Sequence, residues 1–195
     1  MRNESNAALW NSFKQGDWDA YTIMYKEYYG LLNNYGYKFT RNSNLIEDAI
    51  HDLFVRLWTT RENLGDPVSV KNYLYKSLRN TLLRKINTEE KYTGIDTVEY
   101  PHGFEISYQD AAGQAIEQKD FREKVQAVIN TLPARQKEII FLRFYEGLPY
   151  DEIADIMSIG INSAYKLLYK ALENLQHTLG SSPLLAFLLS FGHFT

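Results

Sequence analysis

The segment 161–175 carries polar side chains that can hydrogen-bond to the base edges and phosphates of a DNA duplex. Its apolar residues recur at steps of three and four, the spacing of one helix face, and are Ile161, Ala164, Leu168, Leu172 and Leu175. The opposite face then presents amide, hydroxyl and ammonium groups, whose hydrogen-bonding chemistry suits the major groove. These outward residues are Asn162, Ser163, Tyr165, Lys166, Tyr169 and Lys170.

A second, shorter helix is predicted just before this segment. Pro149 suits the first turn of a helix, and the residues after it form one apolar face, namely Ile153, Ala154 and Met157. The sequence Ser158-Ile159-Gly160 then breaks the helix. Two helices joined by such a turn, with the small Ala154 where they approach, indicate a helix-turn-helix. The alternative is an ordinary helical hairpin with a solvated face.

A basic helix forms a second candidate contact with nucleic acid. Between Val68 and Thr88 there are five basic residues and no acidic one, although the whole chain has a net charge of −3. Basic side chains follow phosphates, and interleaved aromatic and amide groups can stack on or hydrogen-bond to unpaired bases. The residues that we select as candidates are Lys71, Asn72, Tyr75, Lys76, Arg79 and Asn80.

The chain offers no convincing arrangement for catalysis or for a metal or other cofactor. It contains no cysteine, and its four histidines, His51, His102, His177 and His193, are scattered along the sequence. Glu47, Asp48 and Asp52 cluster on one predicted helix, but no second helix offers matching ligands. We therefore interpret this cluster as a solvated or partner-binding surface and expect no enzyme, no cofactor and no small-molecule substrate.

The distribution of charge divides the chain into three parts. Residues 1–90, 91–117 and 118–195 carry 12, 1 and 8 basic residues against 11, 5 and 8 acidic ones. The middle part lacks a sustained period, which predicts a flexible acidic linker. The absence of cysteine, of a signal peptide and of roughly 18 consecutive apolar residues favours a cytoplasmic protein.

Helical periodicity on both sides of the linker predicts an all-α fold with two helical lobes. The expected boundaries are 5–90 for the first lobe, 91–117 for the linker, 118–178 for the second lobe and 179–195 for an apolar tail. Within the first lobe, we expect Asn44 to cap a helix whose buried stripe includes Ile46, Ile50 and Leu53.

Four strings in this order resemble bacterial RNA polymerase sigma factors of the extracytoplasmic-function (ECF) group, over roughly residues 5–178. The first lobe contains FKQGDWDAYTIMYKEYYGLLNNYGYKF and EDAIHDLFVRLW, similar to the start and the polymerase-binding helix of sigma region two, and VKNYLYKSLRNTLLRKI, similar to its promoter-melting part. The second lobe contains INTLPARQKEIIFLRFYEGLPYDEIADIMSIGINSAYKLLYKALENL, similar to sigma region four.

The resemblance implies an alternative sigma factor whose partners are core RNA polymerase and promoter DNA, with an anti-sigma factor as a further candidate. Core polymerase is expected at the outward face of the helix 47–61, at Asp48, His51, Asp52, Val55 and Arg56. The basic helix is expected at the promoter element near the start site, and the outward residues of 162–170 at the distal element. The second lobe is then a helix-turn-helix of the sigma region-four type.

Two other functions remain open from the residues. The chain could be a free-standing helix-turn-helix transcriptional regulator, or an all-α interaction module that does not bind DNA. The tail PLLAFLLSFGHF contains no charged residue apart from a titratable histidine, and is too short to span a bilayer. We expect it to pack on the protein's own lobes, with partner docking and membrane binding as the alternatives.

Overall fold

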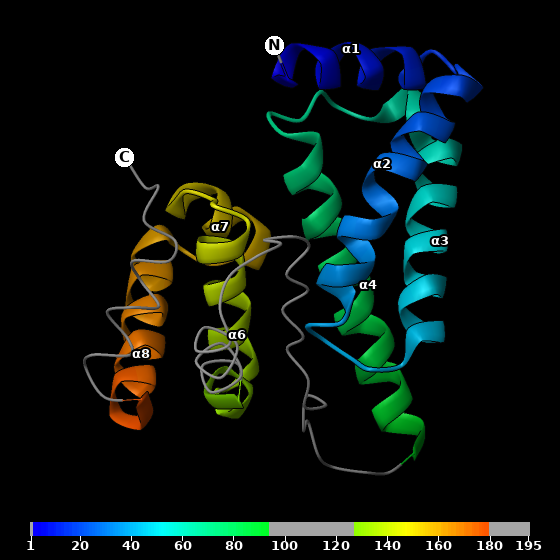
Figure 1. Cartoon of the computed structure of the whole chain (residues 1–195). Helices are drawn as coiled ribbons and strands as arrows, with labels where there is room; N and C mark the ends of the chain where they lie inside the picture. The colour runs from blue at the N-terminus through cyan, green and yellow to red at the C-terminus, as the bar shows by residue number, and fades with distance from the viewer. Residues whose placement is uncertain (1, 94–126, 180–195) are drawn as a thin grey trace, which may run out of the picture. The chain divides into compact units, whose positions relative to one another are not determined.

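The computed structural model describes residues 2–93 and 127–179 of the chain. The chain divides into two compact units, Met1–Glu99 and Tyr100–Thr195. Every regular element within the described ranges is helical, and these ranges contain no strand (Figure 1). The all-α class with two helical lobes is thus confirmed. Most of the expected linker, from residue 94 onward, and the tail from residue 180 lie outside the described residues.

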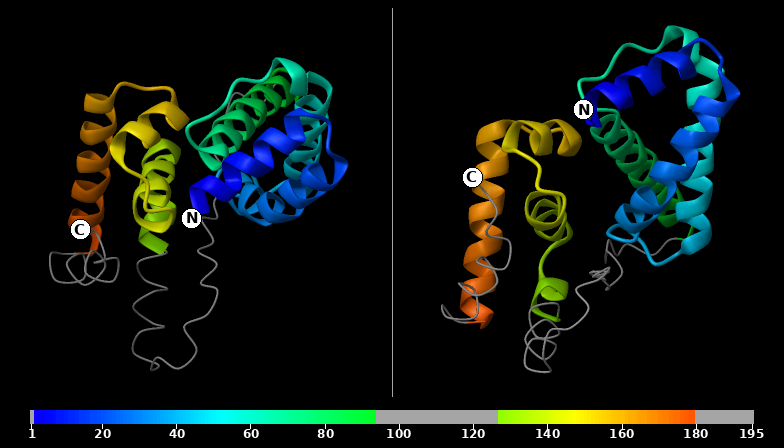
Figure 2. Two further views of the ribbon diagram at one scale, coloured as in Figure 1. Left: turned by 90° about the horizontal axis from the view of Figure 1, so that it is seen from above. Right: turned by 45° about the horizontal axis from the view of Figure 1, so that its top comes forward.

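Within residues 2–93, the first unit consists of four helices and one short turn: α1 (Arg2–Lys14), α2 (Trp18–Gly36), α3 (Ser43–Thr60), the 3-10 turn η1 (Arg61–Asn63) and α4 (Val70–Thr93). Helices α2, α3 and α4 pack against one another, and α1 lies across one end of them (Figure 1, Figure 2). The basic stretch belongs to α4, which runs on to Thr93 and so includes the first residues of the expected linker.

Aromatic and aliphatic side chains fill the interior of the first unit. Along α2 the residues Met24, Tyr28, Leu32 and Tyr35 recur at steps of three and four, and all four are buried. The buried stripe of α3 faces them, and α1 adds two fully covered rings, Trp10 and Phe13. Burial of each such side chain stabilises the fold by roughly 1.5–3 kcal/mol relative to leaving it exposed.

A glycine allows α2 and α3 to approach closely. A Cβ atom built on Gly36 would lie 2.5 Å from Cγ2 of Ile46, a β-branched side chain that is itself fully buried. A side chain fits there only if the Ile46 side chain or one of the two helices shifts. The last turn of α2 is therefore packed directly against the first turns of α3.

Side-chain caps begin two of these helices. The Asp17 carboxylate accepts hydrogen bonds from the backbone N–H groups of Asp19 and Ala20, at 2.9 and 3.2 Å, at the start of α2. The start of α3 is capped by Asn42, whose Oδ1 accepts from the N–H of Leu45 at 3.2 Å. The expectation that Asn44 is this cap is wrong, because Asn44 already lies inside the helix.

The second unit has a helical stretch at 127–131, then α6 (Ala134–Ile140), the π-helical turn η2 (Phe141–Tyr145), α7 (Tyr150–Met157) and α8 (Ile161–Leu179). Helix α8 packs against both α6 and α7. An interhelical hydrogen bond, from Nδ2 of Asn174 to Oε1 of Gln136 at 2.8 Å, fixes α8 on α6. The sequence Gly147-Leu148-Pro149 lies between η2 and α7 and separates them.

The turn between α7 and α8 has the geometry of a helix-turn-helix. Ser158 ends α7 in the left-handed region, at φ 54° and ψ 50°, and the N–H of Ile159 donates to the carbonyl of Ala154 at 2.9 Å. The carbonyl of Gly160 accepts from Ser163 and Ala164 to begin α8. Both Ala154 and Ala164 are buried, as the close approach of the two helices requires. The predicted helix-turn-helix is therefore confirmed.

Candidate nucleic-acid interface

Helix α8 presents one polar, positively charged face. All six residues predicted to point outward are exposed: Asn162, Ser163, Tyr165, Lys166, Tyr169 and Lys170. The buried face packs through Ala164, Leu168, Ala171 and Leu175. Residues 161–172 include two lysines and no acidic residue, so the face is cationic along three turns. Such a face can contact both phosphates and base edges.

One residue of the predicted apolar stripe of α8 is exposed. Ile161 is part of the predicted apolar stripe, yet 49% of its surface is exposed. It is the first residue of α8 and directly follows the turn, at the end of the stripe. Its apolar side chain is accessible next to the exposed residues Asn162 and Ser163 and was not selected as a candidate contact.

Tyr165 does not project freely into solvent, although about half of its surface is exposed. Its ring stacks on the ring of Tyr150, the first residue of α7, with 3.8 Å between ring centroids. Tyr169, one turn further along α8, is 73% exposed. Of the two tyrosines on the outward face of α8, Tyr165 is therefore stacked on another ring, whereas Tyr169 is mostly exposed.

The six candidates on α4 do not share one open face. Asn80 is exposed and Lys71 and Lys76 are half-buried, whereas the buried residues are Asn72, Tyr75 and Arg79. The Tyr75 ring stacks on Tyr35 of α2 with 4.6 Å between centroids. In this conformation the accessible polar residues of α4 include Lys71, Lys76, Asn80 and the exposed Arg84.

The spacing of residues along α4 could have predicted the burial of Tyr75 and Arg79. Tyr75 adjoins Leu74 and precedes Leu78 by three residues, so it flanks the apolar stripe of α4 and is carried toward α2. Arg79 follows Tyr75 by four residues and lies on the same side of the helix. A wider stripe on α4 therefore accounts for both buried side chains.

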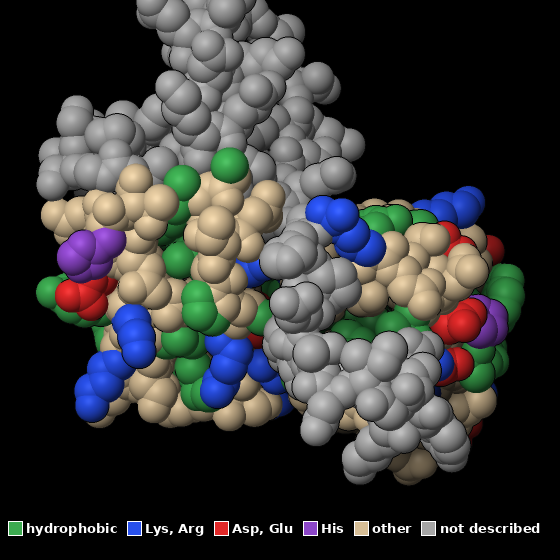
Figure 3. All heavy atoms as spheres, turned by 90° about the horizontal axis from the view of Figure 1, so that it is seen from below, with side chains coloured by type: hydrophobic (Ala, Val, Ile, Leu, Met, Phe, Trp, Pro, Cys, Tyr) green, Lys and Arg blue, Asp and Glu red, His purple; other side chains and the backbone are tan. Residues whose placement is uncertain are grey.

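Helix α3 presents a separate face of mixed acidic and apolar character. The five predicted polymerase contacts are all exposed: Asp48, His51, Asp52, Val55 and Arg56. They lie opposite the buried residues Ile46, Ile50, Leu53 and Leu57. In the space-filling view, acidic and histidine side chains lie together at one edge of the first unit (Figure 3).

An ion pair joins this face to the basic helix. Nζ of Lys85 lies 2.7 Å from Oδ2 of Asp52, with the Asp52 side chain 56% exposed. Because the pair is solvent-accessible, it contributes only about 0–1 kcal/mol to stability. It does, however, set the two candidate surfaces side by side across α3 and α4.

An exposed aromatic cluster continues the α3 face toward its C-terminal end. Trp18 is 59% exposed and meets Trp58 edge-on, with 4.9 Å between centroids. Tyr21 packs beside both rings, and burial, with Tyr25 as a smaller cause, raises the pKa of its phenol. Trp18 is a large apolar residue within a helix, so its exposure is a second feature that apolar spacing alone does not predict.

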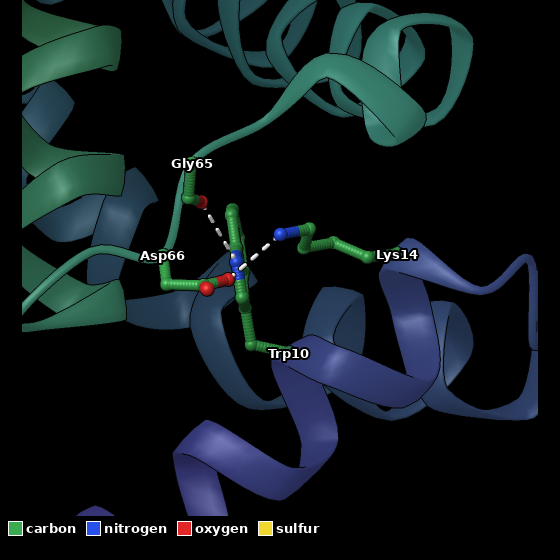
Figure 4. A network of polar contacts seen from close by, with 4 residues as sticks. All are labelled: Trp10, Lys14, Gly65 and Asp66. Atoms are coloured by element: carbon green, nitrogen blue, oxygen red, sulfur yellow. Dashed lines mark hydrogen bonds and ion pairs between the residues drawn. The ribbon is translucent and has the colours of Figure 1, made fainter.

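The loop before α4 is fastened to α1. Nε1 of Trp10 donates to the carbonyl of Gly65 at 3.2 Å, and Nζ of Lys14 lies 2.7 Å from Oδ1 of Asp66 (Figure 4). A pocket of about 160 Å³ lies between α1 and this loop, lined in part by Asn6, Trp10 and Val68. These contacts join residues more than 50 positions apart and fix where the basic helix begins.

The described residues contain no cluster of three or more metal-ligating side chains. Within them, none of the helices combines the length and the apolar character that crossing a membrane requires. What the described surfaces offer is a cationic helix-turn-helix face, a basic helix and an acidic–apolar face.

Two family models match the chain and together cover more than half of it. The model "Sigma-70 region 2" matches residues 24–92, and "Sigma-70, region 4" matches residues 122–175. The first match therefore contains the α3 face and the basic helix, and the second contains the helix-turn-helix.

Curated relatives carry the same description. The RNA polymerase sigma factor SigV of Bacillus subtilis is 28% identical over 140 residues, which cover 70% of this chain and 77% of SigV. The ECF RNA polymerase sigma-E factor of Haemophilus influenzae is 24% identical over 183 residues, 89% of this chain and 94% of the relative.

Solved structures show the same fold. The sigma factor RpoE of Bartonella quintana, in complex with the anti-sigma factor NepR, aligns with a TM-score of 0.62 at 17% identity, over 83% of this chain and 97% of RpoE. CnrH, in complex with the cytosolic domain of CnrY, aligns with a TM-score of 0.61 at 14% identity, over 90% of this chain and 97% of CnrH. The chain belongs to the sigma-70 family of transcription initiation factors and, within it, to the extracytoplasmic-function group.

Proposed function

We propose that this sigma factor binds core RNA polymerase through its first unit and directs it to promoters through contacts from both units. One observation carries the proposal: an exposed acidic–apolar face, a basic helix and a cationic helix-turn-helix occur in one chain that matches both sigma regions. It acts as an initiation factor in the cytoplasm and catalyses no reaction itself. We assign residues 5–90 and 118–178 to the two functional domains and 91–117 to the linker.

The exposed face of α3 is the proposed polymerase contact. Its residues combine carboxylates with an apolar side chain, Val55, that is 44% exposed. A surface with an apolar centre and flanking charges suits a protein partner better than DNA, whose phosphates would repel Asp48 and Asp52. His51 and Arg56 complete this contact.

The two cationic surfaces are the proposed promoter contacts. On α4 the accessible groups, Lys71, Lys76 and Asn80, suit the strand that separates near the start site, since they join phosphate neutralisation with base hydrogen bonding. Asn72, Tyr75 and Arg79 then support this surface from inside the unit. On α8 the outward face suits the duplex of the distal element.

An anti-sigma factor is the proposed regulatory partner. The solved sigma factor RpoE was determined with the anti-sigma factor NepR, and CnrH, which has the same fold, with the cytosolic domain of CnrY. In this chain, the exposed Trp18, Ile23 and Val55 provide apolar surface on the same unit that we assign to polymerase. A protein that covered this surface would compete with polymerase.

Reconstitution tests the proposal. Purified protein is added to core polymerase and a library of genomic promoter fragments, and transcripts are mapped from their 5′ ends. We expect initiation at a discrete set of sites that share two sequence elements. Specific duplex binding without polymerase, together with no transcript in its presence, would support a free-standing regulator in place of a sigma factor.

A further inference from the structure

Two tyrosines from different helices form a stack at the edge of the outward face of α8. The rings of Tyr150 on α7 and Tyr165 on α8 have centroids 3.8 Å apart and an interplanar angle of 25°. This separation is shorter than the roughly 4.5–7 Å usual for aromatic pairs, so the two rings overlap face to face. One face of the Tyr165 ring is thus covered, while 51% of the residue stays exposed.

Tyr150 is in turn held by Arg143 of η2. The guanidinium carbon of Arg143 lies over the Tyr150 ring, 5.0 Å from its centroid. Nη1 of the same side chain donates to the carbonyl of Leu148 at 2.9 Å, in the turn just before α7. A cation over the ring is attracted by its π-electrons, and the backbone hydrogen bond fixes the cation.

These contacts restrict the side chain of Tyr165 before any ligand binds. An exposed side chain on a helix surface usually exchanges among rotamers, and ordering it at an interface opposes binding. A stacked ring has already lost most of that freedom, so less is lost when DNA binds. Tyr169 provides the contrast, because it is 73% exposed and has no ring contact within the described residues.

We propose that Tyr150 and Arg143 are positioning residues that hold the Tyr165 ring in the orientation in which α8 meets the major groove of the distal promoter element. The inference rests on the proposed function, because it assigns to these residues a part in promoter selection. Tyr150 need not contact DNA for this role. Its contribution is transmitted through the orientation of Tyr165.

A double-mutant cycle with the reconstituted holoenzyme tests the inference. The probes are duplexes whose distal element the wild-type holoenzyme has selected from a randomised library, and the same duplexes with that element scrambled. The measured quantity is the specificity ratio, which is the affinity for the selected duplex divided by the affinity for the scrambled duplex. We expect Tyr150→Ala and Tyr165→Ala each to reduce this ratio about two- to tenfold, the range that one aromatic pair supports.

Two comparisons distinguish positioning from a merely structural role. Tyr150→Phe keeps the ring and should keep the wild-type ratio of affinities. The double variant Tyr150→Ala with Tyr165→Ala should reduce this ratio no more than either single variant does. Tyr169→Ala is the matched control, since its reduction of the ratio should add to that of Tyr150→Ala when the two substitutions are combined. Thermal unfolding of each variant checks that the second unit stays folded.

The outcomes separate this inference from the function on which it rests. If wild-type holoenzyme gives no promoter-specific transcript, the proposed function fails and the inference fails with it. If transcription is specific but Tyr150→Ala keeps the wild-type ratio, only the positioning role is overturned. The same holds if Tyr150→Phe is as defective as Tyr150→Ala, or if the losses at Tyr150 and Tyr165 are additive.

Discussion

Asp52 lies at the border between two surfaces of the first unit, because it belongs to the exposed face of α3 and also pairs with Lys85 of α4. Its neighbour on the same face, Asp48, is exposed as well. The two carboxylates therefore allow the proposed polymerase contact to be tested with and without a change in the α3–α4 ion pair.

Reversing either charge should weaken binding to core polymerase. Asp48→Lys and Asp52→Lys place a like charge where the partner offers a complementary one, so we expect affinity to fall about ten- to a hundredfold. Fluorescence anisotropy with labelled protein measures it. Glu27→Lys, a reversal at an exposed position of α2, is the control and should bind as wild type. Wild-type affinity for both aspartate variants would remove α3 from the interface.

Tyr21 should make the first unit sensitive to alkaline pH. Burial raises the pKa of its phenol above 10.0, and Tyr25 raises it further. Below about pH 10 the phenol is protonated in both folded and unfolded chains, and its contribution to stability is fully present. Above that pH the unfolded chain releases the proton first, so the free energy of unfolding should fall as pH rises toward the folded-state pKa.

The variant Tyr21→Phe keeps the ring and removes the titrating group. Its free energy of unfolding should therefore fall less steeply between about pH 9 and about pH 11 than that of wild type. All three tryptophans, Trp10, Trp18 and Trp58, lie in the first unit, so tryptophan fluorescence in urea follows this unit alone. Tyr169→Phe, in the second unit, is the control. An equal slope for Tyr21→Phe and wild type would contradict the assignment.

At the scale of helices, α2 contains two glycines in opposite surroundings. Gly36 is buried against Ile46, whereas a Cβ atom built on Gly30 would meet nothing within 4 Å. The same substitution therefore has opposite expected effects at two positions of one helix.

We expect Gly36→Ala to lower the free energy of unfolding of the first unit by about 1–3 kcal/mol, because the added methyl group overpacks a buried contact. Gly30→Ala should raise it by about 0.5–1 kcal/mol, since alanine loses less entropy in a helix. Urea unfolding followed by tryptophan fluorescence measures both. A neutral Gly36→Ala would show that α2 and α3 are packed less tightly here than the Gly36–Ile46 distance indicates.

For the whole molecule, the proposed contacts divide promoter binding into two steps. The α8 face would recognise duplex DNA, and the accessible groups of α4 would act on the strand that separates. Each lysine that neutralises a phosphate in the closed complex adds about 0.9 to the slope of log affinity against log salt.

The variant with Lys166→Ala and Lys170→Ala should therefore bind promoter duplex more weakly and show a salt slope smaller by about two. The variant with Lys76→Ala and Asn80→Ala should bind the closed complex normally but give less permanganate-reactive thymine near the start site. Filter binding over a salt series and permanganate footprinting separate the two steps. A loss of closed-complex affinity with normal opening in the α4 variant would contradict the division.

The sequence by itself determined the elements that depend on local geometry. The spacing of apolar residues places Ala164 and Leu168 on the inner face of α8 and its polar residues outside, because a helix repeats every 3.6 residues. The outward face of α3 follows from the same repeat, and the break at Ser158-Ile159-Gly160 follows from residues that favour a turn. The family resemblance then connected these elements to transcription initiation.

Only the tertiary structure decided which residues beside the apolar stripe of a helix are covered by a neighbouring helix. Tyr75 and Trp18 are both aromatic residues of helical stretches, yet Tyr75 is buried against Tyr35 of α2, while Trp18, whose ring meets Trp58 of α3, stays 59% exposed. The contacts Trp10–Gly65, Lys85–Asp52 and Tyr150–Tyr165 join different elements. Such pairs depend on how helices pack in three dimensions. The period of one helix fixes only the direction of each side chain, so it does not predict which residue of another element the side chain meets.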